Sequence, residues 1–180
     1  MNGGIKKDNL SNENLQAVIK GCKNLTRHIE NIKSFGIKPV VAINHFSGDS
    51  EKEISGVINF VSNLDTEAIL CKHWANGSEG TINLANKVVE ICNESNQKLK
   101  LLYENNDEII EKIRKIVKNI YRADDIVIDE KIIDQLNQLE NSGFGNLPIC
   151  MAKTQYSFSA DPNLLGAPLG FKIPIKEVRL

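Results

Sequence analysis

The chain lacks several features that would assign it to a special class of protein. Its 180 residues carry 22 basic and 23 acidic side chains, and a formal net charge of −1 gives no field that would attract nucleic acid or an anionic membrane. No apolar run is long enough to cross a bilayer, and the first residues, MNGGIKKDNLSNEN, lack the hydrophobic stretch of a secretory signal. These absences favour an ordinary globular protein of the cytoplasm.

Cysteine motifs are also missing. The four cysteines are Cys22, Cys71, Cys92 and Cys150, and no two of them form a CxxC pair. This spacing argues against zinc binding and redox chemistry. Because each cysteine lies in an apolar helix or strand pattern, we expect four buried, reduced thiols.

What is present is an alternation of short strands and amphipathic helices. Apolar residues at helical spacing predict helices over residues 9–35, 50–64, 81–93, 107–121 and 130–139. Apolar runs predict strands at 40–44, 67–71, 126–128 and 147–152, with weaker strand patterns at 99–103 and 171–178. Ser11 is the expected N-cap of the first helix, with Asn14 three residues into it. The alternation predicts an α/β fold: a mainly parallel sheet of Rossmann-like βα units with helices on both faces.

The last twenty residues break this rhythm. The segment DPNLLGAPLG is rich in turn residues, and the chain then stops at Arg179-Leu180 inside a strand-like pattern. We therefore predict an α/β domain over residues 1–160 and the start of a further domain over residues 161–180.

The only tryptophan, Trp74, lies between a predicted strand and a glycine-containing turn, in the segment EAILCKHWANGSEGTINLANK. In parallel α/β sheets, ligands bind at the carboxyl ends of the strands, where a large ring can stack on an adenine, a pterin or a nicotinamide. The same ring could equally be a core plug with its N–H satisfied, which is the usual fate of tryptophan. The residues leave both interpretations open.

A second aromatic residue, Phe46, follows the predicted strand at 40–44 in VVAINHFSGDSEKEI. The turn after Phe46 leads into a helix whose first amides could receive an anion. A local interpretation is favoured here: Asp49 or Ser50 caps the helix, Glu53 completes a capping box, and Phe46 packs under the loop.

Phe46 and Trp74 carry more information as a pair than either does alone. Because both follow strands of successive βα units, we expect them on the same edge of one sheet, where two rings could clamp a planar ligand. His45 and His73 precede the two aromatics and could reach the same cleft. Their spacing indicates no Ser–His–Asp or Cys–His arrangement.

A polar run follows the predicted strand at 147–152, in ICMAKTQYSFSADP. Lys153 and Thr154 have the KT of phosphate loops, but no GxxxxGK[ST] precedes them, so a P-loop is excluded there. The alternative is a polar surface loop that turns at Asp161-Pro162. An unrelated nucleotide-binding domain has no support, because the chain contains no GxGxxG.

These segments resemble the formate–tetrahydrofolate ligases, also called 10-formyltetrahydrofolate synthetases. The resemblance is carried by GCKNLTRHIENIKSFGIKPVVAINHFSGDSEKEI, HWANGSEGTINLA and LPICMAKTQYSFSADPNLLGAP, and it runs over nearly the whole chain. It implies a ligase of one-carbon metabolism that joins formate to N10 of tetrahydrofolate, using ATP with magnesium, through formyl phosphate. It also implies that Phe46 and Trp74 sandwich the pterin ring of the folate.

Further site residues follow from the same resemblance. Gly77 and Gly80, in the turn after Trp74, would help to shape the folate pocket, and Lys153 and Thr154 are candidate contacts to a ligand. The expected partners are tetrahydrofolate, formate and ATP, together with a missing N-terminal part or further copies of the chain. Neither nucleic acid, a membrane, a metal site nor a tightly bound cofactor is expected.

The chain departs from the family pattern in several places. His45 stands where the family usually has arginine, Ser78 interrupts a double glycine, and Arg122 replaces the glycine of a Tyr-Gly-Ala run. A turn that needs positive φ at Ser78 would be strained by its Cβ. The family's P-loop and C-terminal part lie outside this sequence, so we expect a fragment without ligase turnover. The alternative is an inactive truncated product, or an assembly module that needs a separate P-loop-containing part.

Overall fold

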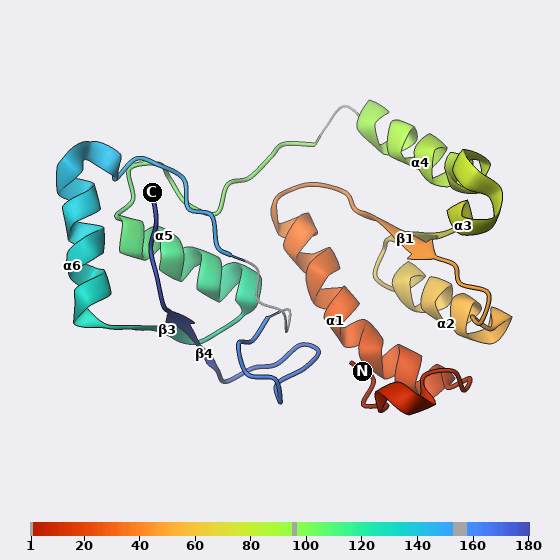
Figure 1. Ribbon diagram of the computed structural model, residues 1–180. Coiled ribbons are helices and arrows are strands. Elements are labelled where there is room, and N and C mark those ends of the chain that lie inside the picture. The colour runs from red at the N-terminus through yellow and green to blue at the C-terminus, as the bar shows by residue number, and fades with distance from the viewer. Residues whose placement is uncertain (1, 95–96, 153–157) are drawn as a thin grey trace. The chain divides into compact units, whose positions relative to one another are not determined.

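The computed structural model describes residues 2–94, 97–152 and 158–180, and Figure 1 shows its elements. The chain divides into two compact units, Met1–Lys100 and Leu101–Leu180, which we describe separately. The boundary expected between residues 160 and 161 falls inside the second unit, and the division into domains 1–160 and 161–180 stays a prediction.

The first unit is built around two parallel strands. β1 (Val40–Asn44) and β2 (Glu67–Cys71) occupy the residues predicted for them. In their register Val40 lies opposite Glu67 and Asn44 lies opposite Cys71, so both strands end at the same edge. The apolar side chains of β1 and β2 contribute to a core around the buried residues Ile29, Val61 and Ala68.

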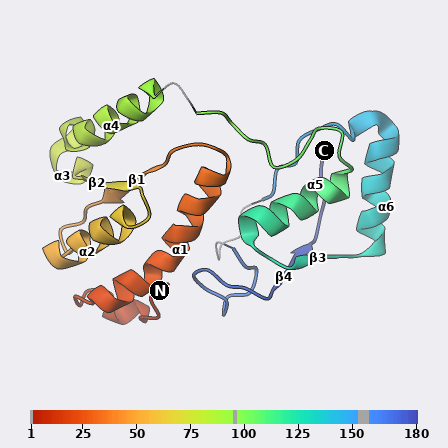
Figure 2. The ribbon, with the colours of Figure 1, turned by 180° about the vertical axis from the view of Figure 1, so that it is seen from behind.

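Helices cover both faces of this strand pair. α2 (Glu51–Ser62) connects the strands and packs against α1 (Leu15–Ser34) on one face, while α4 (Ile82–Asn93) lies on the other, as Figures 1 and 2 show from opposite sides. The remaining elements of the unit are η1 (Lys7–Asn9), α3 (His73–Asn76) and η2 (Gly77–Thr81). The predicted βα organisation is thereby confirmed.

Side-chain caps fix where the first two helices begin. Asn14 Oδ1 accepts the Ala17 N–H at 2.9 Å, so Asn14 is the N-cap of α1 and the prediction of Ser11 is wrong, because the residues around Ser11 form a turn ahead of the helix. Ser50 Oγ accepts the Glu53 N–H at 3.2 Å, as predicted. Glu53 does not complete a capping box, because its carboxylate accepts the Asn14 N–H at 2.6 Å. That bond ties the start of α1 to α2.

The second unit repeats the parallel pairing with a longer connection. β3 (Asp125–Ile128) pairs with β4 (Lys172–Ile175), and Ile126 lies opposite Ile173. Helical segments are α5 (Ile109–Ile116), the π-helix η3 (Val117–Tyr121), α6 (Glu130–Leu139) and the π-helix η4 (Glu140–Phe144). Their apolar faces bury a core of Ile109, Ile113, Val117, Ala123, Ile126, Leu136, Phe158, Phe171 and Ile173. The α/β class is confirmed, with the strands in two small parallel sheets.

The structure has no strand at two segments that were predicted as strands, the weaker pattern at 99–103 and the apolar run at 147–152. Residues 99–103 and 147–152 are extended or turn segments. Pro148 has no N–H to donate to a ladder, and the Ile149 N–H donates instead to the Tyr103 hydroxyl at 2.9 Å. The two segments are thus joined through a side chain, and the strand predicted at 147–152 is wrong.

A buried lysine holds the second unit together at this point. Lys112 is fully buried, and its Nζ donates to the carbonyl oxygens of Gly145 at 2.6 Å and Leu147 at 3.2 Å. The ammonium also lies 5.9 Å from the centroid of the Tyr103 ring. These partners compensate for part of the cost of removing the charge from water.

The cysteines follow the prediction only in part. All four are free thiols; Cys22 and Cys71 are buried, as expected, whereas Cys92 and Cys150 are exposed. Cys92 lies in α4, where only Ile91 is buried, and Cys150 lies in the segment that forms no strand. Burial was wrongly predicted for these two because an apolar neighbourhood in sequence does not guarantee a packing partner.

Candidate functional site

The carboxyl edge of β1 and β2 carries the two aromatic residues. Asn44 and Cys71 end the two strands opposite one another, and the His45 N–H continues the pairing by donating to the Cys71 carbonyl at 3.0 Å. Phe46 is the next residue after His45, and Trp74 is the second residue of α3, three residues beyond Cys71. Parallel pairing therefore brings both residues to one edge, as their positions after successive strands predict.

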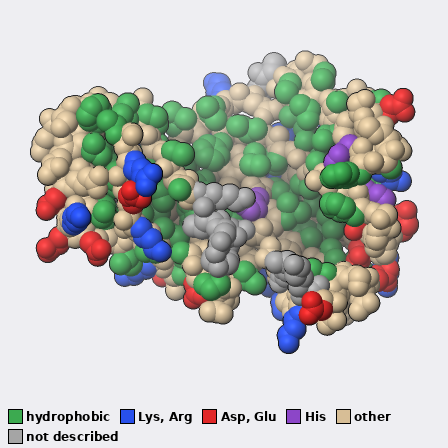
Figure 3. Space-filling view, viewed as in Figure 1, with side chains coloured by type: hydrophobic (Ala, Val, Ile, Leu, Met, Phe, Trp, Pro, Cys, Tyr) green, Lys and Arg blue, Asp and Glu red, His purple; other side chains and the backbone are tan. Residues whose placement is uncertain are grey.

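Both rings are largely exposed. Trp74 is 75% exposed and Phe46 is 58% exposed, and hydrophobic side chains also reach the surface in the region of α3 and α4 (Figure 3). The core-plug interpretation of Trp74 is wrong for the part of the chain that the structure describes. Burying an aromatic side chain is worth several times the thermal energy, so exposed rings at a strand edge indicate a surface that a ligand or partner covers.

A closed turn holds Phe46 in place. The Phe46 N–H donates to Asp49 Oδ2 at 2.8 Å, and the Asp49 N–H donates to the Phe46 carbonyl at 3.0 Å. α2 then begins with its cap at Ser50 and with Glu51 and Glu53 in its first turn. Those carboxylates already interact favourably with the helix dipole, which makes the start of α2 a poor site for a further anion.

Two glycines shape the turn that follows Trp74. The Lys72 N–H donates to the Gly80 carbonyl at 3.0 Å, and a Cβ on Gly80 would lie 2.4 Å from the Lys72 carbonyl carbon and 2.7 Å from the His73 nitrogen. Gly77 has φ 57° and ψ −143°, and its N–H donates to the His73 carbonyl. Because the positive φ falls on Gly77, Ser78 fits this turn without the strain that its Cβ would cause at a left-handed position.

His73 packs beside the tryptophan. The ring centroids of His73 and Trp74 are 6.0 Å apart, with their planes tilted by 36°. The Nδ1 atom of His73 is buried and has no hydrogen-bond partner among the described residues. The spacing of histidine and tryptophan in the sequence predicts a common cleft but gives no sign of this ring contact.

The other two predicted site residues, Lys153 and Thr154, lie outside the described residues. Just after them, Phe158 and Ser159 are buried, and the Ser159 hydroxyl accepts the Asp161 N–H at 2.9 Å. The end of this polar segment therefore packs into the second unit.

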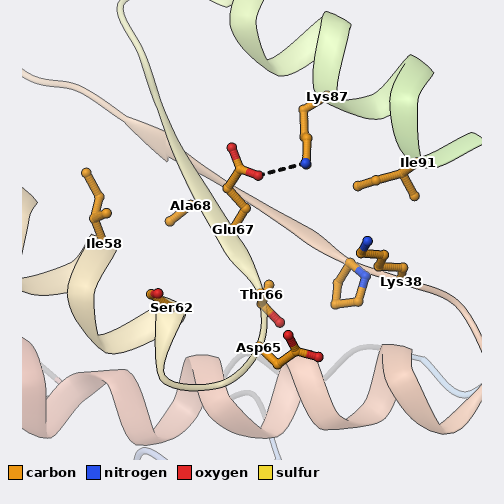
Figure 4. A pocket seen from close by; sticks show the side chains of 10 residues that line it. Lys38, Ile58, Ser62, Asp65, Thr66, Glu67, Ala68, Lys87 and Ile91 are labelled. Carbon is orange, nitrogen blue, oxygen red and sulfur yellow. Dashed lines mark ion pairs between the residues drawn. The ribbon is translucent and has the colours of Figure 1, made fainter.

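A cavity at the opposite end of the strands was not predicted. It has a volume of about 380 Å³ and lies at the amino ends of β1 and β2, between α2 and α4 (Figure 4). Lys87 Nζ lies 2.9 Å from Glu67 Oε2 and 2.8 Å from Glu90 Oε1, and the bond to Glu67 chiefly raises the pKa of Lys87. The positive charge of Lys87 is thus neutralised within the chain. The ion pair with Glu67 fastens α4 to β2, and the cavity offers no unpaired charge at Lys87 to bind a charged ligand.

The described residues contain neither a membrane-spanning helix nor a metal-binding group. None of the helices there is both long and apolar enough to cross a membrane. Within the same ranges no three histidine, cysteine, aspartate or glutamate side chains are grouped to hold a metal ion.

Comparison with known proteins finds one family that matches the whole chain. The family model described as formate–tetrahydrofolate ligase matches residues 1–180. Over the same 180 residues the chain is 52% identical to the formate–tetrahydrofolate ligase of Sinorhizobium fredii, 53% identical to that of Mesorhizobium japonicum and 51% identical to that of Pelagibacter ubique. Each alignment covers 100% of this chain and 32% of the relative, so the chain spans about a third of these proteins' length.

Proposed function

This chain belongs to the formate–tetrahydrofolate ligase family, and we propose that Phe46 and Trp74 form the two aromatic walls of its folate site. The observation that carries the proposal is their joint position: two exposed rings at the carboxyl edge of one parallel strand pair. A pterin is a flat ring system of matching size, and covering both indole and phenyl faces with it would remove apolar surface from water.

In the whole protein, we propose that this site holds tetrahydrofolate while formate is joined to it. The names of the relatives support formate and tetrahydrofolate as substrates, and the family resemblance adds ATP with magnesium and formyl phosphate as the activated intermediate. Phe46 and Trp74 offer no proton donor or acceptor suited to that chemistry. Their role is to orient the folate so that its nitrogen meets the activated formyl group.

Gly77 and Gly80 shape the turn that follows Trp74 and so support the same site. The close approach of Gly80 to Lys72 and His73 fixes the start of α3, and the positive φ of Gly77 ends that single helical turn. A larger side chain at Gly80 would move the segment that carries Trp74. We propose these glycines as pocket-forming residues rather than ligand contacts.

A second candidate function is an assembly surface. Ile82, Val88 and Val89 of α4 are between 42% and 58% exposed, which favours contact with another part of the protein or a further chain. This alternative would leave Trp74 covered by protein and not by folate.

The test is a titration with tetrahydrofolate, followed by the fluorescence of Trp74, which is the only tryptophan. Stacking should quench the emission, and Phe46→Ala should weaken binding by about 5- to 30-fold, the equivalent of about 1–2 kcal/mol for a lost stacking face. Phe144→Ala removes a comparable exposed ring from the second unit and should bind as the unaltered chain does.

Three results would separate the candidates. Quenching that weakens in Phe46→Ala but not in Phe144→Ala supports the clamp. Quenching that is equal in both variants would mean that Phe46 is no part of the site. Unquenched emission, with concentration-dependent burial of Trp74 seen by sedimentation and emission shift, would favour the assembly surface.

A further inference from the structure

We infer that His73 is a specificity-determining residue of the folate site, whose Nε2–H donates a hydrogen bond to an acceptor on the edge of the pterin ring. The inference rests on the function proposed above and extends it from stacking to recognition. Its starting point is the contact of the His73 and Trp74 rings, 6.0 Å apart and tilted by 36°. A ligand that stacks on Trp74 therefore has an imidazole beside it.

The surroundings of the imidazole decide which nitrogen carries the proton. Nδ1 is buried with no partner in the described part of the chain, and Nε2 is not among the buried atoms there that lack a partner. Neutral histidine carries one N–H and one lone-pair nitrogen. A buried N–H without an acceptor is the rarer and costlier defect, so the proton belongs on Nε2. His73 thus presents a donor beside the Trp74 ring.

Such a donor supplies what stacking lacks. Aromatic faces accept nearly any flat ring, because stacking depends little on the identity of the edge atoms. A pterin carries a carbonyl oxygen and ring nitrogens along its edge, and these can accept an N–H. A site that forms an edge hydrogen bond discriminates strongly against rings that lack the matching acceptor.

The local backbone is built to hold this donor still. The His73 carbonyl accepts the Gly77 N–H at the end of α3, and the absence of a Cβ at Gly80 lets that chain pass close to the His73 nitrogen. Both contacts constrain the first residue of α3. The imidazole and the indole are therefore carried by one short, fixed turn.

Three substitutions of His73 test the donor by changing the distance of the side-chain N–H from the backbone, or by removing it. His73→Gln places an amide N–H at about the distance of Nε2 from the backbone, whereas His73→Asn places one at about the distance of Nδ1, and His73→Phe keeps the ring without a donor. Tetrahydrofolate binding is measured by quenching of Trp74, and circular dichroism checks that each variant folds. His28→Asn, on an exposed histidine of α1, is the matched control.

The expected result is a pattern, not a single loss. His73→Phe and His73→Asn should weaken binding by about 5- to 30-fold, while His73→Gln and His28→Asn should stay within about threefold of the unaltered chain. A mere packing role for His73 would instead be preserved best by phenylalanine.

Failure of the inference and failure of the clamp give different results. Suppose that tetrahydrofolate quenches the unaltered chain. If His73→Gln then binds as poorly as His73→Phe, or if His73→Asn binds normally, His73 is not the proposed donor, and the clamp of Phe46 and Trp74 stands. If the unaltered chain shows no quenching, the clamp fails and the inference falls with it.

Discussion

The two parallel strand pairs of this chain are built alike and end differently. In the first unit, the chain leaves β1 and β2 into Phe46 and Trp74, which are 58% and 75% exposed. In the second unit the aromatic residues Phe158 and Phe171 pack against the strands and are 3% and 7% exposed. The two pairs of rings differ in position along the chain: Phe46 and Trp74 come after strands, whereas Phe158 and Phe171 both come before β4.

That contrast tells how each unit uses its aromatic residues. The second unit buries Phe158 and Phe171 together with isoleucines of α5, so these two rings contribute to folding stability. The first unit leaves Phe46 and Trp74 at a strand edge held by short hydrogen-bonded turns, where they contribute little to its own core. Exposed rings on a hydrogen-bonded backbone are suited to binding, since less backbone entropy is lost when a ligand binds.

Gly80→Ala is expected to have the largest effect on this contrast, because it should disturb the turn that holds Trp74 at the strand edge. The new Cβ would lie 2.4 Å from backbone atoms of Lys72, and backbone cannot move aside as a flexible side chain can. We expect a destabilisation of about 2–3 kcal/mol, measured by urea denaturation followed through Trp74 fluorescence. Gly48→Ala is the control, since a Cβ there meets nothing within 4 Å. Equal stability of the two variants would show that the turn after Trp74 adapts.

Removal of the buried ammonium should disturb the second unit next most. Lys112→Met keeps the length of the side chain but leaves the carbonyls of Gly145 and Leu147 without a donor. We expect a loss of about 2 kcal/mol, read as faster hydrogen exchange of the α5 amides. Lys131→Met, at an exposed position of α6, should leave the exchange unchanged. Protection that survives in Lys112→Met would mean that the two carbonyls find other donors.

The smallest effect sharpens the comparison through backbone conformation. Where the first unit uses Gly77 at positive φ, the second unit uses Arg122, with φ 57° and ψ 30°, at the end of η3. Arg122→Gly should stabilise the unit by about 0.5–1 kcal/mol. Glycine relieves the strain of the left-handed conformation, and its greater freedom in the unfolded chain offsets part of that gain. Thermal unfolding followed by circular dichroism measures the gain. Arg122→Ala keeps the Cβ and should show no gain; an equal gain there would place the strain in the side chain.

Much of the secondary structure could be read from the sequence, because it depends on local patterns. β1 and β2 have the predicted bounds, and the alternation of apolar runs with amphipathic helices correctly indicates the α/β class. The cap of α1 and the segment 147–152 were wrongly predicted for different reasons. Several polar residues near 11–14 can cap a helix, and an extended segment becomes a strand only where a partner offers a ladder.

The candidate site divides in the same way. Position after successive strands is a local property, and it suffices to predict that Phe46 and Trp74 share an edge. Three features could not be predicted: the exposure of Trp74, the positive φ at Gly77 and the ring contact of His73 with Trp74. The first depends on which surfaces meet, the second on one backbone angle, and the third on the orientation of two side chains.

The sequence by itself determined the α/β class, the two strands of the first unit and the resemblance of three segments to one family of ligases. Only the tertiary structure decided that Trp74 is an exposed ring and not part of a core, that Lys112 is enclosed, and that Glu53 ties α2 to the start of α1. The physical reason is that hydrophobic periodicity is written along the chain, whereas burial depends on which surfaces finally meet.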